Sequence, residues 1–410
     1  MSTKSNHPLK KWLVLGAGVV LQAVLGGIYA WSAFVPPLYE QAGLSKGQCG
    51  SIFGLAIATF AIAMIPAGKF LQRFGPRLTA AIGSILFGVG YLLASYSNGS
   101  FVGLLLSYGL VVGVGIGFGY VCPLTTGMKW FPDNKGLVTG VAVAGFGGGA
   151  IILSSVAEHL LYHSHFSIFE VFRFTGLVFG VLALTASLFI SEPERSADAV
   201  EADESISLKP NLMTGTFALS FLGMFSGTFA GLLVIGNLKP MMLDFGLDEF
   251  YATLTISLFA IGNIVGRIFW GQVHDRLGSR NTILISLGFF FVTMLALHVR
   301  EAESALILAT PLIGAGFGGC FVIYASTIVE KFGVKLFARM YPICFLGYGL
   351  AALTGPSIGG WLADRSGSFS DGINLSLATI LLTIIVIFFS FDRGIDATLL
   401  EAQKPSEGIQ

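Results

Sequence analysis

Residues 262–280 read Gly262-Asn-Ile-Val-Gly-Arg267-Ile-Phe-Trp270-Gly-Gln-Val-His-Asp275-Arg-Leu-Gly-Ser-Arg280. The first half of this stretch belongs to an apolar run that carries one full charge, Arg267, before its polar end at His274. At about 1.5 Å per helical residue, Arg267 lies roughly 10 Å inside that end. A charge at this depth in a bilayer is costly, which makes Arg267 a candidate functional residue. Asn263 lies one turn earlier on the same helix face.

The composition is that of a polytopic membrane protein. Of the 410 residues, 54% are apolar and 11% are charged, whereas soluble proteins carry about 25% charged residues. The net charge is zero, so no nucleic-acid partner is indicated. The four cysteines have no CxxC spacing, and neither a disulfide framework nor a zinc site is predicted. The apolar run after Lys11 is too long for a signal-peptide core, and we expect it to be retained as the first span.

Apolar runs long enough to cross a bilayer recur along the whole chain. They are continuous and lack the alternation of barrel strands, so the predicted fold class is all-α with twelve transmembrane helices. The predicted spans are 12–36, 48–70, 77–97, 101–129, 136–160, 168–190, 212–238, 250–273, 280–299, 303–328, 338–362 and 375–391.

A polar, acidic stretch divides these spans into six and six. We expect an N-terminal bundle at 1–191, a cytoplasmic linker loop at 192–211 and a C-terminal bundle with a short tail at 212–410. With the N-terminus inside, 17 of the 23 lysines and arginines fall on the cytoplasmic side and five, including Lys239, on the outer side. This bias predicts that both termini face the cytoplasm, in the plasma (cytoplasmic) membrane. Arg267 is then the one charge predicted inside a span.

A short basic loop motif occurs once in each half, at a fixed offset of 203 residues. Because each half has six spans, equivalent spans run in the same direction. Two parallel, pseudo-symmetric bundles with a site between them are the plan of a rocking secondary transporter. The motif residues are Gly68, Arg73 and Arg77 in the first copy and Gly271, Asp275, Arg276 and Arg280 in the second.

The loop motif resembles that of the major facilitator superfamily, with Gln72 where the family usually has an acid. Other stretches resemble its branch of monocarboxylate transporters and oxalate–formate exchangers, and within that branch most resemble bacterial monocarboxylate (L-lactate) carriers. These stretches are Tyr29-Ala-Trp31 in the first span, Trp130-Phe-Pro-Asp-Asn-Lys135 after the fourth and Arg267-Ile-Phe-Trp270-Gly in the eighth.

The resemblance implies that Arg267 pairs with the substrate carboxylate. Animal members often have an acid where Asn263 stands, and they use a first-span lysine that this chain lacks. The oxalate exchanger has a lysine where Tyr348 stands. The aromatic box of the oxalate exchanger, in its spans one and ten, corresponds to Tyr29, Phe317, Phe321 and Tyr324. Its span-four tyrosine corresponds to Tyr120.

Two interpretations of Arg267 are open. Its side chain is long enough to reach the cytoplasmic surface, or it binds substrate, which we favour because it lies well before the helix end. A guanidinium suits one carboxylate through two parallel hydrogen bonds. With no acidic partner in the spans, this single cation matches a monoanion, because the second charge of a dianion would stay unpaired at a cost of several kcal/mol.

The remaining candidates have functional and structural alternatives. Asn263 either holds a substrate hydroxyl, orients Arg267 or bridges helices. Tyr120 needs a hydroxyl partner if it is buried, in the site or in packing. The predicted lining, for which plain core packing is the alternative, consists of Ile28, Tyr29, Phe317, Phe321, Phe345 and Tyr348. The loop-motif residues are expected to engage helix ends or acids in one conformational state, or only to set topology.

No enzyme, cofactor or metal site is predicted. Gly145-Phe-Gly147-Gly-Gly-Ala150 fits a dinucleotide pattern but lies inside an apolar span with no preceding strand. HExxH and Walker sequences are missing from the chain. The sequence therefore offers no catalytic constellation.

The predicted function is secondary transport of a small monocarboxylate of the L-lactate or pyruvate class by rocker-switch alternating access. The resemblance implies symport with a proton. However, all 23 acidic residues lie in loops or near span ends, so the sequence shows no intramembrane proton relay. An oxalate/formate-type exchanger is the alternative, against which Tyr348 argues. The expected partners are the anion, a proton and the lipid bilayer.

Overall fold

The protein is described from a computed structural model, within which residues 8–131, 135–193, 208–299 and 303–391 are described. Within these ranges every regular element is helical, as predicted. The elements of the N-terminal half are α1 (Pro8–Gly26), η1 (Gly27–Phe34), α2 (Val35–Ala42), α3 (Lys46–Phe74), α4 (Pro76–Ser95), α5 (Phe101–Leu104), η2 (Leu105–Val112), α6 (Gly113–Trp130), α7 (Lys135–Glu158), η4 (His159–His163), α8 (Ile168–Phe174), η5 (Thr175–Phe179) and α9 (Gly180–Phe189). Those of the C-terminal half are α10 (Lys209–Leu212), α11 (Gly215–Gly236), α12 (Leu238–Asp244), α13 (Glu249–Val299), α14 (Glu303–Phe332), α15 (Val334–Ser366) and α16 (Ser370–Ser390).

Eleven helices in the described ranges are long and apolar enough to cross a membrane. One of them, α13, has 51 residues and is interrupted at Gly278, whose backbone is not helical (φ 70°, ψ 176°). At about 1.5 Å per residue, an unbroken helix of that length would be more than twice as long as a bilayer is thick. The break therefore divides α13 into the predicted eighth and ninth spans, and the prediction of twelve spans is confirmed.

The two copies of the loop motif form the same turn. Gly75, between α3 and α4, has φ 81° and ψ 166°, and Gly278, its equivalent 203 residues later, has nearly the same angles. Side chains with a Cβ rarely adopt a positive φ. The repeated glycine is therefore explained by the repeated turn, which reverses the chain between two antiparallel spans.

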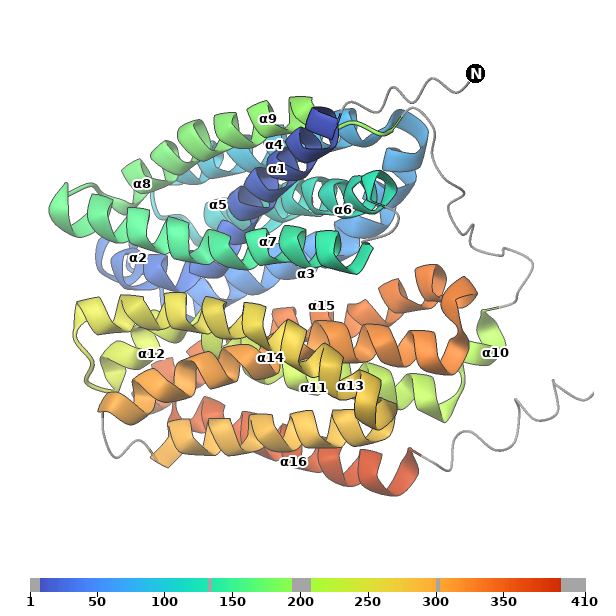
Figure 1. Cartoon of the computed structure of the whole chain (residues 1–410). Coiled ribbons are helices and arrows are strands. Elements are labelled where there is room, and N and C mark those ends of the chain that lie inside the picture. Colours follow the sequence, from blue (N-terminus) through green and yellow to red (C-terminus); the bar gives the residue numbers. More distant parts are fainter. Residues whose placement is uncertain (1–7, 132–134, 194–207, 300–302, 392–410) are drawn as a thin grey trace, which may run out of the picture.

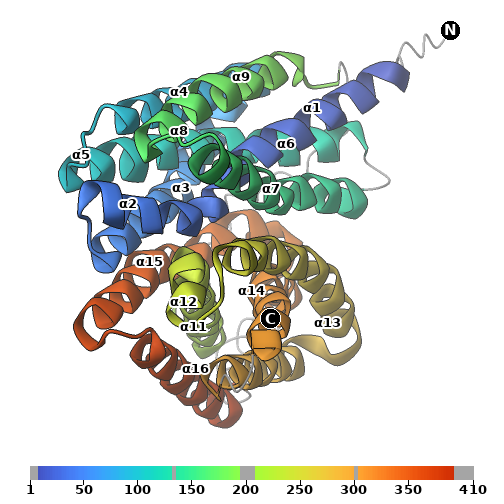
Figure 2. The same ribbon diagram turned by 90° about the vertical axis from the view of Figure 1, so that its left-hand side faces the viewer.

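The helices form two groups that face each other. Figures 1 and 2 show α1–α9 on one side of the molecule and α11–α16 on the other. The main contacts between the groups join α3 to α15 and α7 to α13. The predicted linker overlaps residues 194–207, which lie outside the described residues, so the domain boundaries given above stay a prediction.

One end of the molecule, where α3 begins at Lys46, joins the two halves closely. We call it the Lys46 end, and we call the opposite end, at the turns of Gly75 and Gly278, the motif end. In Figure 1 the Lys46 end is on the left, with α2 and α12. A Cβ on Gly50 or Gly54 of α3 would overlap backbone atoms of α15. Glycine at these positions therefore permits the two helices to approach at backbone distance.

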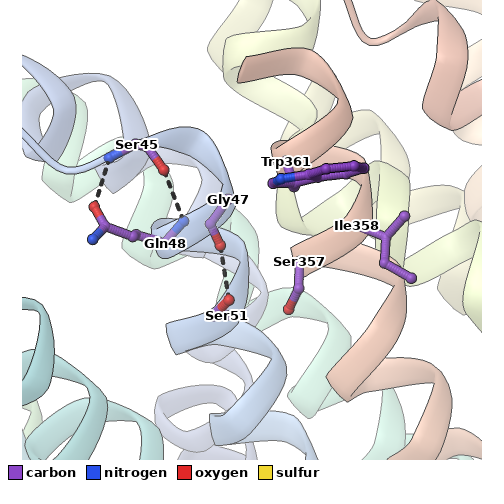
Figure 3. Close-up of a pocket in the computed structure, with 7 residues that line it drawn as sticks. All are labelled: Ser45, Gly47, Gln48, Ser51, Ser357, Ile358 and Trp361. Carbon is purple, nitrogen blue, oxygen red and sulfur yellow. Dashed lines mark hydrogen bonds between the residues drawn. The ribbon is translucent and has the colours of Figure 1, made fainter. Parts of the chain in front are cut away.

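The first turn of α3 is also held by side chains. Ser45 and Gln48 form a reciprocal capping box, with 3.2 Å from the Gln48 amide nitrogen to Ser45 Oγ and 3.0 Å from the Ser45 amide nitrogen to Gln48 Oε1. Figure 3 shows this turn beside Ser357 and Trp361 of α15. Asp364, farther along α15, accepts hydrogen bonds from the backbone amides of Lys46 and Gly47. The start of α3 is thus anchored to the opposite half.

Candidate functional site

Arg267 lies on the middle part of α13, between Asn263 and Phe321. Its Nε donates to Asn263 Oδ1 at 3.0 Å, and its guanidinium carbon lies 4.7 Å from the ring centre of Phe321 on α14. The side chain is partly exposed, and no carboxylate among the described residues pairs with it. A guanidinium has five N–H donors; Asn263 occupies Nε and the hydroxyl of Tyr120 is a second partner, so donors on the terminal nitrogens remain to bind a further group.

The predicted aromatic residues of the C-terminal half gather beside this guanidinium. Phe321 lies 5.2 Å from Phe317 and 5.2 Å from Tyr348, measured between ring centres. Phe345 lies 4.9 Å from Tyr348. Phe317 and Tyr348 are fully buried, whereas Phe321 and Phe345 are partly exposed. These four rings form a continuous apolar wall next to the positive charge.

The N-terminal half contributes a second aromatic group. The ring of Tyr120 on α6 packs at 5.0 Å from Phe146 of α7 and at 5.1 Å from Phe60 of α3. The ring of Tyr29 in η1 lies 5.6 Å from Phe146. Sequence reasoning selected Tyr29 and Tyr120 but missed Phe60 and Phe146, which are ordinary phenylalanines in apolar spans and carry no signal of their own.

The two aromatic groups meet between the halves. The hydroxyls of Tyr29 and Tyr348 are hydrogen-bonded at 2.9 Å, and both side chains are buried. Phe321 lies between the guanidinium of Arg267, at 4.7 Å, and the ring of Tyr348, at 5.2 Å, and the hydroxyl of Tyr120 is a partner of that guanidinium. Tyr341, another residue that the sequence did not reveal, donates to the carbonyl oxygen of Phe321 at 3.1 Å. Arg267 therefore lies at the interface, with tyrosine hydroxyls from both halves around it.

Two candidates lie at the margin of this cluster. Ile28 is fully buried in η1, directly before Tyr29. Tyr324 is also buried, but its hydroxyl lies close to Gly223 of α11, within the C-terminal half. The structure thus brings Arg267, Asn263, Tyr120, Tyr29, Phe317, Phe321, Phe345 and Tyr348 together, and Tyr324 packs elsewhere.

The loop-motif residues make their described contacts within one half. Glu330 of α14 accepts hydrogen bonds from the backbone amide and the hydroxyl of Ser279, at 3.0 Å and 2.6 Å. Arg280 donates to the carbonyl oxygen of Phe388 at 3.0 Å. Arg73 lies over the ring of Phe74, its chain neighbour. A role of the motif in conformational switching therefore stays a prediction.

A second charged cluster, unforeseen from the sequence, joins the halves at the Lys46 end. Lys239 of α12, predicted as an outer-loop residue, has a side chain with 0% exposure, so Arg267 is not the only charge enclosed by the fold. Its Nζ lies 2.8 Å from Glu158 Oε2 of the other half and 2.8 Å from Glu249 Oε2 of its own half. Thr253 donates to Glu158 Oε2 at 2.7 Å. The sequence concealed this cluster because each member lies at a helix end and only the fold brings them together.

Comparison with known proteins agrees with this architecture. The profile of the Major Facilitator Superfamily matches residues 16–235 and 216–408. Among solved structures, a bacterial homolog of the human lysosomal transporter Spinster, described as inward-facing and unoccupied, superposes with a TM-score of 0.72 at 14% identity. That alignment covers 95% of this chain and 98% of the other.

Three curated relatives cover most of the chain. An uncharacterized transporter of this superfamily, YhjX from Escherichia coli, is 29% identical, covering 86% of this chain and 88% of its own. The oxalate:formate antiporter of Oxalobacter formigenes is 27% identical, covering 87% and 86%. Monocarboxylate transporter 2 of Meriones unguiculatus is 25% identical, covering 98% and 88%. The resemblance to this branch is confirmed, and the chain belongs to the Major Facilitator Superfamily of membrane transporters.

Proposed function

We propose that the protein is a secondary transporter that moves one small monocarboxylate, of the L-lactate or pyruvate class, across the membrane by alternating access. The observation that carries this proposal is the guanidinium of Arg267, which lies between the halves without a carboxylate partner. An enclosed cation that the protein leaves unneutralised needs an anion from elsewhere, because an uncompensated charge in such surroundings is costly.

The contacts of Arg267 prepare it for a carboxylate. Asn263 holds Nε and the hydroxyl of Tyr120 is a second partner, so the orientation of the guanidinium is restricted while other N–H donors on its terminal nitrogens remain. The ring of Phe321 lies against the guanidinium and adds a cation–π contact. A carboxylate that accepts two parallel hydrogen bonds from the guanidinium forms the stronger type of charge-assisted pair. The nearby hydroxyl of Tyr120 supplies a further donor for the bound anion or its substituent.

The surroundings favour an anion with one charge. The lining beyond the guanidinium is aromatic and contains no second cation among the described residues of the cluster. A dianion such as oxalate would bring one carboxylate to Arg267 and leave the other against phenylalanine rings. An unpaired charge in that position costs several kcal/mol. The antiporter and monocarboxylate transporter named above act on carboxylates, which supports the same substrate class.

We further propose that the protein lies in the plasma membrane, with the Lys46 end facing the outside of the cell and both termini in the cytoplasm. The excess of lysine and arginine on the motif side supports this orientation. Contacts between the halves at the Lys46 end then close the outer side, so the conformation is inward-facing. The structural neighbour of similar shape is likewise described as inward-facing.

Proton symport is the proposed form of coupling. Binding the anion neutralises Arg267 within the site, and a proton carried together with the anion makes the transported pair electrically neutral. The complete transport cycle then moves no net charge across the membrane, so the membrane potential does not oppose it.

The experiment is uptake of labelled L-lactate into proteoliposomes by wild type, Arg267→Lys and Arg267→Ala. Lysine keeps the charge but loses the bidentate geometry, so Arg267→Lys should retain a reduced rate and Arg267→Ala should fall to background. Replacement of Arg173, which lies over the ring of Tyr96 away from the site, provides a matched control. Wild-type lactate transport by Arg267→Ala would refute the proposal.

An oxalate–formate exchanger is the second candidate, favoured by the 27% identity to the antiporter. Counterflow separates the two functions. Vesicles loaded with unlabelled oxalate should accumulate labelled oxalate if the exchanger is correct, and should not if Arg267 is the single anchor of a monoanion.

A further inference from the structure

We propose that Gly231 of α11 sets the length of the substrate chain that the carboxylate site accepts, because it leaves space for the ring of Phe317. Phe317 belongs to α14 and is fully buried, and its ring centre lies 5.2 Å from that of Phe321, which contacts Arg267. The inference rests on the proposed function and adds to it a residue that controls which monocarboxylates bind.

The ring of Phe317 packs directly on the backbone of α11. A Cβ added to Gly231 would lie 2.3 Å from Cδ2 of Phe317, 2.8 Å from its Cγ and 3.0 Å from its Cβ. Carbon atoms in contact are normally about 3.5–4.0 Å apart, so the ring occupies the place that a larger residue at position 231 needs. Alanine there must displace the ring by roughly 1 Å or more.

The neighbours of this ring decide where it can move. Phe259 of α13 lies 5.7 Å from it, measured between ring centres, and Tyr29 of the opposite half lies at 5.9 Å. Tyr29 is itself held by its hydroxyl contact with Tyr348 at 2.9 Å. The remaining direction leads toward Phe321 and hence toward Arg267. A ring displaced from α11 therefore approaches the bound anion.

An anion bound at Arg267 extends its apolar part along the same wall of rings. The carboxylate takes guanidinium donors, and Phe321 lies against the guanidinium at 4.7 Å. The carbon atoms beyond the carboxylate then pack against Phe321 and Phe317, so a longer chain reaches farther along the wall. One methylene too many in an apolar pocket changes binding roughly 10- to 200-fold. The position of the Phe317 ring therefore limits the chain length.

Gly231 and Phe317 lie in the same half, on α11 and α14. In carriers built from two such bundles, alternating access is largely a rigid-body motion of one bundle against the other. The contact between the glycine and the ring then persists through the cycle, and the limit on chain length applies whichever side is open. Gly231 does not touch the substrate, so it is a positioning residue that acts through Phe317.

The same helix offers a matched control one turn earlier. Gly227 also faces α14, but a Cβ added there would meet Sγ of Cys320, at 2.6 Å, and no ring of the site. Gly227→Ala thus adds the same methyl group to the same contact between α11 and α14 without pressing on Phe317. This variant reports any general separation of the two helices.

The probes are glycolate, L-lactate and L-2-hydroxybutyrate, which share a carboxylate and a hydroxyl and differ by one carbon each. Isothermal titration calorimetry gives the dissociation constant of each acid. Gly231→Ala should weaken binding of the longest acid at least about tenfold more than it weakens binding of glycolate. Gly227→Ala should change the three constants by factors that agree within about twofold. Thermal unfolding without ligand shows that each variant is folded.

Removal of the ring tests whether Gly231 acts through it. Phe317→Ala should shift the preference toward the longer acids. With the ring gone, adding Gly231→Ala should leave that preference unchanged within about twofold. A merely structural role of Gly231 would instead weaken all three acids equally, and it would not depend on the ring.

Three results overturn the inference: equal weakening of the three acids by Gly231→Ala, the same chain-length effect from Gly227→Ala, or a chain-length effect of Gly231→Ala that survives in the Phe317→Ala background. A Phe317→Ala protein that gains nothing for the longer acids also contradicts it. These outcomes leave the proposed function intact, because the acids still bind the wild type. If none of the three binds the wild type, the proposed function fails and the inference falls with it.

Discussion

Asn263 and Arg267 lie one turn apart on α13, and the hydrogen bond between them distinguishes this site from one in which an acid neutralises the arginine. The sequence predicted both residues because a charge inside an apolar run is visible at once. It could not predict Tyr341 or Phe60, because neither breaks the apolar pattern of its span. Lys239 was misleading because a lysine directly after a span is normally a loop residue, whereas here α12 continues inside the protein.

Replacing Asn263 by aspartate should make substrate binding depend on pH. The ionised aspartate would pair with Arg267 and compete with the substrate carboxylate, while its protonated form would leave the guanidinium free. We expect affinity for L-lactate to fall at least about tenfold at neutral pH and to recover as the pH is lowered. Isothermal titration calorimetry with L-lactate at several pH values measures this affinity. Asn263→Ala, which adds no charge, should weaken binding without the pH dependence, and equal pH profiles for the two variants would contradict the account.

The hydroxyl pair of Tyr29 and Tyr348 should show strong coupling in a double-mutant cycle. Either single Tyr→Phe change leaves the other hydroxyl buried without its partner, at a cost of about 1–3 kcal/mol. Removing both hydroxyls leaves no unsatisfied group, so the double variant should be more stable than the sum of the single effects predicts. Thermal unfolding of the four proteins gives the coupling energy. Strictly additive effects would show that the 2.9 Å contact contributes nothing to stability.

At the scale of elements, the sequence predicted the number of spans but not their interruptions. The first span was expected at 12–36, and the structure has one continuous stretch from Leu9 to Ala42. Within it, Ile28 and Tyr29 lie in η1, a 3-10 helix, which is wound more tightly than the α-helix before it. Hydropathy depends on which residues are apolar and not on the backbone hydrogen-bond pattern, so it cannot reveal such a segment.

The close approach of α3 and α15 gives a prediction at this scale. A methyl group on Gly50 would overlap the backbone of Pro356, so Gly50→Ala should force the helices apart and weaken closure of the Lys46 end by about 1–3 kcal/mol. Gly16 of α1 has no atom within 4 Å of an added Cβ, and Gly16→Ala is the control. The readout is the distance between spin labels on cysteines that replace Tyr39 of α2 and Phe250 of α13, two exposed side chains on opposite halves near this end. Equal distances in the two variants would show that α3 and α15 do not limit closure.

The turn at Gly278 gives a second prediction at the scale of elements. Its positive φ is unfavourable for residues with a Cβ, so Gly278→Ala should lower the free energy of unfolding by about 1–2 kcal/mol. Gly288, in the helical part that follows, has open space around an added Cβ, and alanine there should be neutral or slightly stabilising. Unfolding of both variants in denaturant measures their free energies of unfolding. A stable Gly278→Ala protein would mean that the break in α13 does not depend on glycine.

At the scale of the whole molecule, two halves with related loop motifs enclose Arg267 near the middle and Lys239 at the Lys46 end. They are joined at that end by the ionic contacts of Lys239 with Glu158 and of Lys46 with Asp244. The repeat offset in the sequence anticipated the duplicated turns at Gly75 and Gly278. The closed Lys46 end could not be anticipated, because it depends on which pairs of helix ends meet.

Acidification outside should accelerate uptake of L-lactate into proteoliposomes that contain the wild type. The proposed symport acts in this direction. The rate is measured with the interior held at constant pH. A flat rate between about pH 5.5 and about pH 8 would exclude proton coupling.

The central claim is that Arg267 binds the single charge of a monocarboxylate. It is tested most directly by the shift in unfolding temperature of the wild type and of Arg267→Ala with L-lactate, its uncharged amide and oxalate. The account predicts stabilisation by lactate alone in the wild type, and by none of the three in Arg267→Ala. Lactate stabilisation that persists in Arg267→Ala, or equal stabilisation of the wild type by the uncharged amide, would contradict it.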